Sequence, residues 1–271
     1  MKSIKVSSDH RRLLEVALKA VRAGERASIA RFSDQRMKPA GYKKHREIVT
    51  AGDMAANAAI IRLLKRATPS IPICSEEGAD MPAKNLAKAD LAWVLDPIDG
   101  TSNFAIRLPL WGISLALVVA GEPVIGVISL PVLGQTYASV RGAGAWMGKR
   151  RITVSSVRRL RDAVAFMCYG YRNEERRRGT RIADAFSPRV QVARRLGAAV
   201  VEATWVASGR ADLSILSGVH PWDVAAGALL VREAGGKVLT TKGRDWTIND
   251  PDIVFATPNI VPEAMRVLRS G

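Results

Sequence analysis

Residues 93–104 read WVLDPIDGTSNF, an apolar run that leads into two aspartates and then into Gly-Thr-Ser. Three apolar residues in a row before the first acid are typical of a buried strand. Pro97 restricts the backbone between Asp96 and Asp99, so the two carboxylates can converge on one point. The residues that follow can begin a helix whose first N–H groups face the same point. The segment therefore predicts a strand, a turn that carries two carboxylates, and a helix start.

The chemistry of this turn points to phosphate and metal together. The N–H groups of Gly100, Thr101 and Ser102 would attract a phosphate, but the two aspartates beside them would repel it. Cations between the acids and the phosphate remove that conflict, so the arrangement implies a metal. An ordinary Asp-Pro-x-Asp-Gly surface turn explains the same residues without any ligand, and this segment alone does not separate the two interpretations.

Two further segments place acids at the ends of apolar runs. Residues 71–78, IPICSEEG, end in Glu76 and Glu77, and residues 221–227, PWDVAAG, put Asp223 at the start of an apolar helix. Each has an ordinary explanation as well. Paired glutamates after a strand are commonly solvated, and an aspartate at a helix start is commonly an N-cap.

The rest of the pattern indicates an α/β (α+β) protein with two halves, residues 1–150 and 151–271, packed as one compact unit. Helical spacing begins at Asp9 and again after Thr50, which is a plausible N-cap. Strands of a mixed or antiparallel sheet are predicted in the first half at 71–74, 91–95, 113–119, 124–130 and 136–140. The second half predicts helices at 196–208, 224–234 and 262–269, and strands at 163–169, 211–216, 237–240 and 252–256.

The chain is strongly basic, with 41 Lys and Arg against 25 Asp and Glu and a formal net charge of +16. Residues 141–195 hold much of the excess, because they carry 15 basic and 4 acidic residues and include the run Arg176-Arg177-Arg178. Three explanations stay open: a solvated basic face, a polyanion partner such as RNA, or steering of phosphorylated substrates. No RNA-binding motif with interleaved aromatic residues accompanies the charge.

Other residue types narrow the class of protein. Cys74 and Cys168 are far apart in sequence and predict free thiols in a reducing cytoplasm. The three histidines lack zinc spacing, so a bound metal would have oxygen ligands and would be a hard cation such as Mg²⁺. The most apolar stretch, residues 108–134, is interrupted by a Glu-Pro pair and a further proline, and it predicts core strands instead of a membrane span.

Taken together, these segments resemble the inositol monophosphatase family. One family signature is an apolar pair followed by Asp-Pro-Ile-Asp-Gly-Thr and then Asn-Phe, and residues 94–104 fit it. A second is Trp-Asp-x-Ala-Ala-Gly with a closing Gly-Gly after an apolar helix, and residues 222–236 fit that. Further family motifs occur in family order over nearly the whole chain: Val49-Thr50-x-x-Asp53, Glu76-Glu77-Gly78, Gly142-x-Gly144-Ala145-Trp146 and Ala207-x-Gly209-Arg210-x-Asp212.

The resemblance implies the layered αβαβα sandwich of the inositol monophosphatase / fructose-1,6-bisphosphatase type, a homodimer, and a site with two or three Mg²⁺ ions between the halves. Glu76, Asp96 and the carbonyl of Ile98 correspond to ligands of the first ion. Asp96 also bridges to a second ion that Asp99 and Asp223 hold.

The same resemblance implies the remaining roles. Thr101, supported by Asp53, corresponds to the pair that orients the attacking water, with Glu76 near it. The segment Gly100–Ser102 corresponds to the phosphate-binding amides, and Glu77 to a residue that supports these groups or holds a third ion.

The periphery departs from the family pattern. A glutamate that contacts substrate hydroxyls is common seven residues before the last metal aspartate, and this chain has Leu216 there. An apolar side chain cannot accept those hydrogen bonds. Residues 197–199 read Gly-Ala-Ala, without the Ser or Thr usual at the middle position. We expect Ala199 and Leu216 to line the substrate pocket, with Leu216 either a neutral variation or the mark of an altered alcohol pocket.

The predicted activity is lithium-sensitive, Mg²⁺-dependent hydrolysis of inositol monophosphate or a related polyol or sugar phosphate. The same chemistry on histidinol phosphate, fructose bisphosphate or a 3′-phosphonucleotide is an alternative. Another is a regulatory protein that uses its basic face to bind RNA or a transcription complex. We expect a cytoplasmic protein that does not bind membranes.

Overall fold

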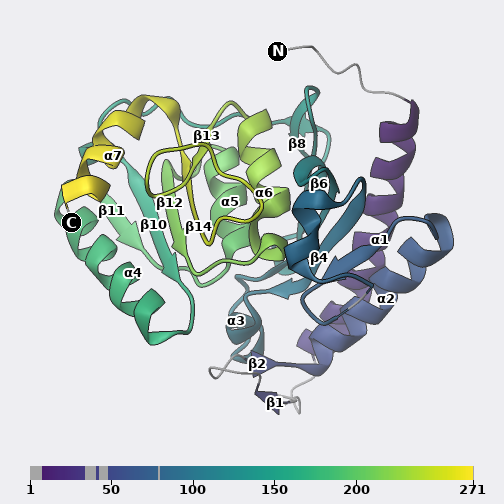
Figure 1. The fold of residues 1–271 in the computed structure, drawn as a ribbon. Helices are drawn as coiled ribbons and strands as arrows, with labels where there is room; N and C mark the ends of the chain where they lie inside the picture. The colour runs from purple at the N-terminus through teal and green to yellow at the C-terminus, as the bar shows by residue number, and fades with distance from the viewer. Residues whose placement is uncertain (1–7, 34–40, 43–47, 79, 271) are drawn as a thin grey trace.

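Two long helices form the first outer layer of the protein, which we describe from a computed structural model that covers residues 8–33, 41–42, 48–78 and 80–270. They are α1 (Ser8–Phe32) and α2 (Ala51–Ala67), and they pack side by side (Figure 1). Thr50 caps α2 as predicted. Its hydroxyl accepts a hydrogen bond from Gly52 N at 3.1 Å, and the carboxylate of Asp53 accepts one from Thr50 N at 2.8 Å. This reciprocal pair fixes where α2 begins.

The second layer is a seven-stranded mixed sheet in which only β3 and β4 run parallel. The strands follow one another in chain order across the sheet: β3 (Ile73–Ser75), β4 (Ala92–Asp99), β5 (Gly112–Val119), β6 (Glu122–Leu130), β7 (Gln135–Val140), β8 (Gly144–Met147) and β9 (Arg150–Arg151). One face of the sheet packs on α1 and α2 through buried side chains such as Leu13, Ile60, Trp93 and Leu115. The expected strands between residues 71 and 140 are confirmed, and β8 and β9 extend the sheet beyond them.

Two helices rich in small apolar residues fill the third layer, between the two sheets (Figure 1). They are α5 (Ala199–Ala207) and α6 (Pro221–Glu233), and nearly all of their residues from Ala199 to Ala207 and from Val224 to Val231 are buried. A helix that is apolar all round must be covered on all sides, which is why both lie inside the protein.

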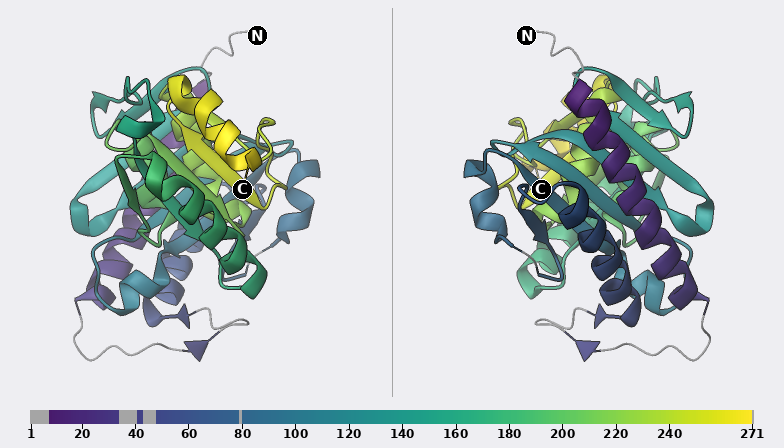
Figure 2. Two further views of the ribbon diagram at one scale, coloured as in Figure 1. Left: turned by 90° about the vertical axis from the view of Figure 1, so that its left-hand side faces the viewer. Right: turned by 90° about the vertical axis from the view of Figure 1, so that its right-hand side faces the viewer.

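A five-stranded sheet and two outer helices complete the layers. The strand order is β11 (Val192–Arg194), β10 (Val164–Tyr169), β12 (Leu213–Ser217), β14 (Asp252–Ala256) and β13 (Lys237–Leu239). On its outer face lie α4 (Asn173–Phe186) and α7 (Val261–Ser270), opposite to the face of the protein formed by α1 and α2 (Figure 2). This arrangement is the αβαβα sandwich that the family resemblance implied.

Small elements connect the layers. They include β1 (Gly41–Tyr42), β2 (Ile48–Val49), α3 (Thr101–Ala105) and the 3₁₀ turns Ala83–Lys88, Pro131–Leu133, Leu160–Asp162, Ser187–Arg189 and Pro258–Ile260. In the described part of the chain, no helix combines the length and apolar character that a membrane crossing requires.

The sequence did not predict α4, and its composition explains why. The helix carries the arginine run and buries only Gly179 and Phe186 among its residues. Gly179 lies directly on the ring of Tyr169, where a Cβ atom would come within 2.1 Å of Cδ1. The helix is therefore held by a close backbone approach and a few apolar side chains, which leaves little hydrophobic periodicity in the sequence.

Candidate metal centre

Three carboxylates from two layers converge at the C-terminal end of β4. Asp96 and Asp99 lie on β4, and Asp223 lies in the first turn of α6. One oxygen of each can be chosen so that all three lie within 4.8 Å of one another. The strand continues through both aspartates, whereas the sequence predicted that it would end before them. Its pairing with β5 shifts register between Asp96 and Asp99, and this irregularity lets both acids face the same point.

Backbone N–H groups fix the orientation of each carboxylate. Asp96 Oδ1 accepts a hydrogen bond from Ile98 N at 3.0 Å, Asp99 Oδ2 accepts one from Val200 N at 2.7 Å, and the carboxylate of Asp223 accepts one from His220 N. The donor to Asp99 belongs to the first turn of α5, where helix N–H groups have no partner within the helix. The cluster is therefore built by the first sheet and by the starts of both central helices.

Burial and mutual repulsion make this cluster costly without a cation. Asp96 is only 2% exposed, and its pKa lies well above the usual range because burial removes water and because Glu76, Asp99 and Asp223 repel its charge. Burial likewise raises the pKa of Asp99 to about 7, although the hydrogen bond from Val200 lowers it in part. Hard divalent cations prefer such oxygen donors, so the residues present fit Mg²⁺.

The paired glutamates lie close to the cluster but outside the group of three. They follow β3, where Glu76 N donates to the carbonyl of Leu95 on β4 at 3.1 Å. Both side chains are half-buried. The charge of Glu76 raises the pKa of Asp96 and of Asp99, and the charge of Glu77 raises that of Asp53, so both glutamates add to the negative potential here.

A threonine and a buried aspartate form a hydrogen bond beside the cluster. Thr101 Oγ1 lies 3.1 Å from Asp53 Oδ1 and 2.9 Å from the carbonyl oxygen of Ile98. Asp53 is fully buried, and this burial raises its pKa to about 6, against hydrogen bonds from Thr50 that lower it. The single hydroxyl hydrogen can serve one acceptor at a time, so a water molecule near Thr101 could donate to the other.

The turn after Asp99 requires glycine. Gly100 has φ of 86°, and a Cβ atom there would lie 2.9 Å from Cβ of Ala198. This conformation starts α3 at Thr101, so the N–H groups of the first turn lie next to Asp99. The hydroxyl of Ser102 lies 2.8 Å from the hydroxyl of Tyr171, an exposed residue between β10 and α4.

Three residues that support this region were not singled out by the sequence analysis. Asn103 belongs to the Asn-Phe part of the family signature, but no role was predicted for it. Its Nδ2 donates to the carbonyls of Leu110 at 2.6 Å and Leu196 at 2.8 Å. Glu202 on α5 is fully buried, accepts a hydrogen bond from Ser214 Oγ at 2.8 Å, and has a pKa that burial raises to about 8. Tyr171 is the third. Apart from the contact between Asn103 and Leu110, each of these contacts joins residues more than ten positions apart, so no local pattern could have revealed it.

The two predicted pocket residues lie in neighbouring layers, Ala199 on a central helix and Leu216 on the five-stranded sheet. Ala199 is the first residue of α5, next to the Val200 amide that contacts Asp99, and it is 6% exposed. Leu216 on β12 is 2% exposed and belongs to the apolar cluster between the two sheets. Its side chain therefore contributes to packing in the protein as it stands.

Comparison with known proteins gives one consistent family. The sequence model of the inositol monophosphatase family matches residues 9–269. A protein named inositol monophosphatase from Dictyostelium discoideum is 33% identical over 238 residues, which cover 87% of this chain and 87% of that protein. A protein named Nus factor SuhB from Pasteurella multocida (strain Pm70) is 31% identical over 260 residues, which cover 95% of this chain and 96% of that protein.

A solved structure matches the fold over the same extent. The extragenic suppressor protein suhB from Bartonella henselae superposes with a TM-score of 0.88 at 28% sequence identity, and the match covers 96% of this chain and 99% of that chain. The agreement therefore includes both sheets and all three helical layers.

Proposed function

Because the chain belongs to the inositol monophosphatase family, we propose that it is a Mg²⁺-dependent phosphomonoesterase that hydrolyses inositol monophosphate or a related polyol or sugar phosphate. The observation that carries the proposal is the convergence of Asp96, Asp99 and Asp223 from distant segments within 4.8 Å. Three carboxylates at this separation repel one another strongly, and a divalent cation is the simplest partner that stabilises them.

In this proposal Asp96, Asp99 and Asp223 hold two or three Mg²⁺ ions together with Glu76 and the carbonyl of Ile98. When bound, these ions neutralise the phosphate and favour formation of the nucleophile from water. Asp96 sits at the centre of the set, which its burial and its repulsion by Glu76, Asp99 and Asp223 support.

The chain's own groups orient the reaction. The hydroxyl of Thr101, between Asp53 and the Ile98 carbonyl, positions the attacking water by accepting or donating a hydrogen bond, and Asp53 fixes the orientation of that hydroxyl. The water oxygen forms a bond to phosphorus, the ester P–O bond breaks, and the alcohol leaves with a proton. The N–H groups of Gly100–Ser102 hold the phosphate oxygens, on which negative charge is concentrated.

The choice of alcohol is the open part of the proposal. Leu216 offers no hydrogen-bond acceptor, and the segment 197–199 offers no side-chain hydroxyl, so a polyol would have fewer polar contacts here than in relatives that carry Glu and Ser or Thr nearby. Histidinol phosphate, fructose bisphosphate and a 3′-phosphonucleotide are therefore alternative substrates for the same chemistry.

Phosphate release from a panel of these esters, with Mg²⁺ and with EDTA, tests the proposal. We expect at least one ester to be hydrolysed with Mg²⁺, inhibited by Li⁺, and not hydrolysed with EDTA. The variant Asp99→Asn should lose most of this activity, whereas Asp184→Asn, which changes an exposed acid on α4 by the same charge, should keep it. Equal activity with and without EDTA would contradict the proposal.

A second candidate function rests on the relative named Nus factor SuhB and on the basic segment 141–195. In this case the protein would bind RNA or a transcription complex, and catalysis would be secondary. RNA affinity that falls steeply with salt and weakens in the double variant Arg176→Ser, Arg177→Ser, but not in Asp99→Asn, would favour this function. Unchanged RNA affinity in the arginine variant would contradict it.

Two further expectations belong to the proposal. The free thiols Cys74 and Cys168 support a cytoplasmic location, because an oxidising compartment favours disulfides. Formation of a homodimer stays a prediction, which sedimentation equilibrium would test.

A further inference from the structure

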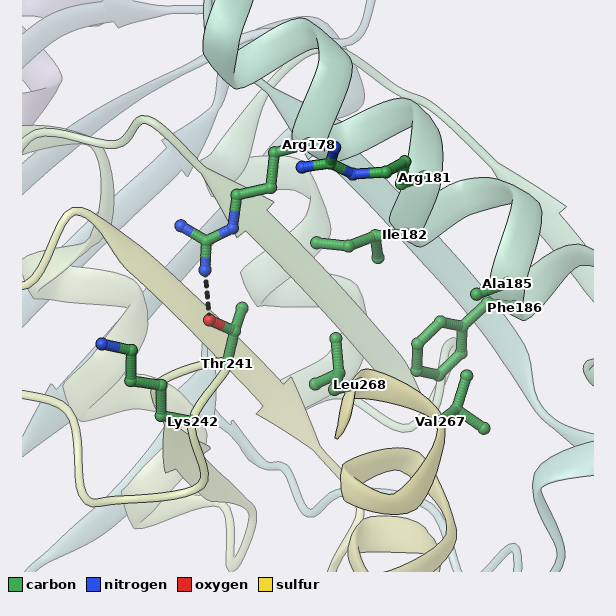
Figure 3. Close-up of a pocket in the computed structure, with 9 residues that line it drawn as sticks. All are labelled: Arg178, Arg181, Ile182, Ala185, Phe186, Thr241, Lys242, Val267 and Leu268. Carbon is green, nitrogen blue, oxygen red and sulfur yellow. Dashed lines mark hydrogen bonds between the residues drawn. The ribbon is translucent and has the colours of Figure 1, made fainter. Parts of the chain in front are cut away.

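A cavity of about 250 Å³ lies between α4 and α7, away from the cluster of aspartates (Figure 3). We call it the α4–α7 cavity. It is lined by Arg178, Arg181, Ile182, Ala185, Phe186, Thr241, Lys242, Val267 and Leu268. These residues come from α4, from the segment after β13 and from α7, so none belongs to the proposed metal centre. The cavity is also large enough to admit a small organic molecule.

The two ends of the α4–α7 cavity differ in chemistry. Figure 3 shows Arg178, Thr241 and Lys242 at one end, with the guanidinium of Arg181 beside them. At the other end the figure shows apolar side chains, contributed by Ala185 and Phe186 of α4 and by Val267 and Leu268 of α7. Such a separation matches a ligand with an anionic group on one side and an apolar body on the other.

The charge at the cationic end indicates which anion fits. Arg178 donates to Asp252 Oδ2 at 2.7 Å and to the hydroxyl of Thr241, so its charge is balanced by a buried carboxylate and its position is fixed. Arg181 and Lys242 are exposed, and in the described part of the chain neither forms an ion pair. The net charge of this end is therefore close to +2. A phosphate monoester dianion balances it, whereas a carboxylate would balance half of it.

We propose that the α4–α7 cavity is a second binding site, separate from the catalytic cluster, for a small phosphate monoester with a compact apolar body. Arg181 and Lys242 bind the phosphate beside the fixed guanidinium of Arg178. Ile182, Ala185 and Leu268 contact the apolar body. Binding in the α4–α7 cavity requires no catalysis at the metal centre, so it can be tested whether or not the protein is a phosphatase.

Benzylphosphonate is a suitable probe because it carries a dianionic head on an apolar ring and its C–P bond cannot be hydrolysed as an ester. Titration is followed by ³¹P NMR at about pH 8.5 in EDTA, so that the metal-free carboxylates Asp96, Asp99 and Asp223 repel the probe from the metal centre. For a ligand of this size we expect a dissociation constant on the order of 1 mM. Inorganic phosphate and benzyl alcohol, which each supply half of the ligand, should both bind at least about tenfold more weakly.

Two kinds of variant locate the binding. The double variant Arg181→Ser, Lys242→Ser should weaken benzylphosphonate binding about tenfold or more, because it removes both unbalanced charges. The matched control Arg12→Ser, Lys19→Ser removes the same two residue types from the exposed face of α1 and should change the affinity less than about twofold. Ala185→Leu fills the apolar end and should weaken benzylphosphonate but not inorganic phosphate.

The binding results that support the α4–α7 cavity differ from those that overturn it. Loss of affinity in the cavity variants alone supports the site. No detectable binding of benzylphosphonate at millimolar concentration overturns the proposal, as does equal loss in the α1 control, which would show a general effect of net charge. Mg²⁺-dependent phosphate release should be unchanged in the Arg181/Lys242 variant, so loss of binding there cannot be attributed to a damaged metal centre.

Discussion

Replacing Asp99 by asparagine should stabilise the metal-free protein while it removes the response to Mg²⁺. Burial raises the pKa of this carboxyl from 3.8 to about 7, so the folded protein holds a proton there that the unfolded chain releases above about pH 4. The ionised form is therefore unfavourable in the fold. This penalty is absent below the unfolded-state pKa, grows as the pH rises, and is complete above about pH 7.

The magnitude follows from the pKa shift. Each pKa unit corresponds to about 1.4 kcal/mol, so a pKa raised from 3.8 to about 7 means that the ionised Asp99 destabilises the fold by at most roughly 4 kcal/mol. Relaxation of the cluster reduces this destabilisation to about 2–4 kcal/mol. Asparagine is uncharged and keeps a side-chain oxygen that can accept the hydrogen bond from Val200 N. In EDTA at about pH 8 the variant should exceed the wild type in free energy of unfolding by this amount.

With Mg²⁺ in place of EDTA, the wild type should instead be more stable than the Asp99→Asn variant. The wild type gains about 2.7 kcal/mol at a Mg²⁺ concentration of 100 times Kd, and the asparagine variant should gain far less because it lacks one ligand charge. Urea unfolding at about pH 5 and pH 8, with EDTA and with Mg²⁺, measures all of these differences. Asp184→Asn controls for the change in net charge. An asparagine variant less stable than wild type in EDTA at pH 8, or one that Mg²⁺ stabilises as much as wild type, would refute the reasoning.

Three other predictions concern the same region. Thr101→Val should lower kcat by about 10²-fold or more with little change in Mg²⁺ affinity, because it removes the water-orienting hydroxyl, and Thr101→Ser should retain most activity in the same phosphate-release assay. Mg²⁺ affinity measured by calorimetry should rise up to about tenfold per pH unit below pH 7, because the ion must displace the proton of Asp99; affinity that is flat from pH 6 to 7 would count against this. Gly100→Ala should cost about 1–2 kcal/mol more in urea unfolding than Gly78→Ala, since both have φ near 86° but only Gly100 has atoms within 3 Å of the added Cβ; equal losses would contradict it.

Local chemistry made part of the fold predictable. The cap at Thr50, the apolar strands up to residue 140 and the central helices all depend on neighbours within a few residues, and these elements are confirmed. Helix α4 depends on Gly179 lying against Tyr169 and on Phe186, and such contacts leave almost no periodic signal. The predicted strand at 91–95 was too short, because β4 continues to Asp99. A register shift opposite β5 accommodates the proline within it.

For the site, the sequence identified the residue types but not what brings them together. That Asp96 and Asp99 would converge was predicted from the proline between them, whereas the place of Asp223 was inferred from the family resemblance alone. The contact of Tyr171 with Ser102, and that of Asn103 with Leu196, join segments 69 and 93 residues apart. Their geometry is set by how the layers stack, so only the three-dimensional structure reveals them.

The candidate metal centre is a junction between layers, and this links ion binding to the packing of the protein. Asp99 on the first sheet is held by the amide of Val200 on α5, and Asp223 reaches the cluster from α6. The depth at which α6 lies on the sheet depends on Gly126, where a Cβ atom would come within 3.0 Å of the carbonyl oxygen of Ala226. Cations bound by Asp96, Asp99 and Asp223 would therefore join β4 to the central helices. Without cations, repulsion among the same carboxylates opposes that packing, so the stability gained from Mg²⁺ should appear in the contact between the first sheet and α6 as well as in the site itself.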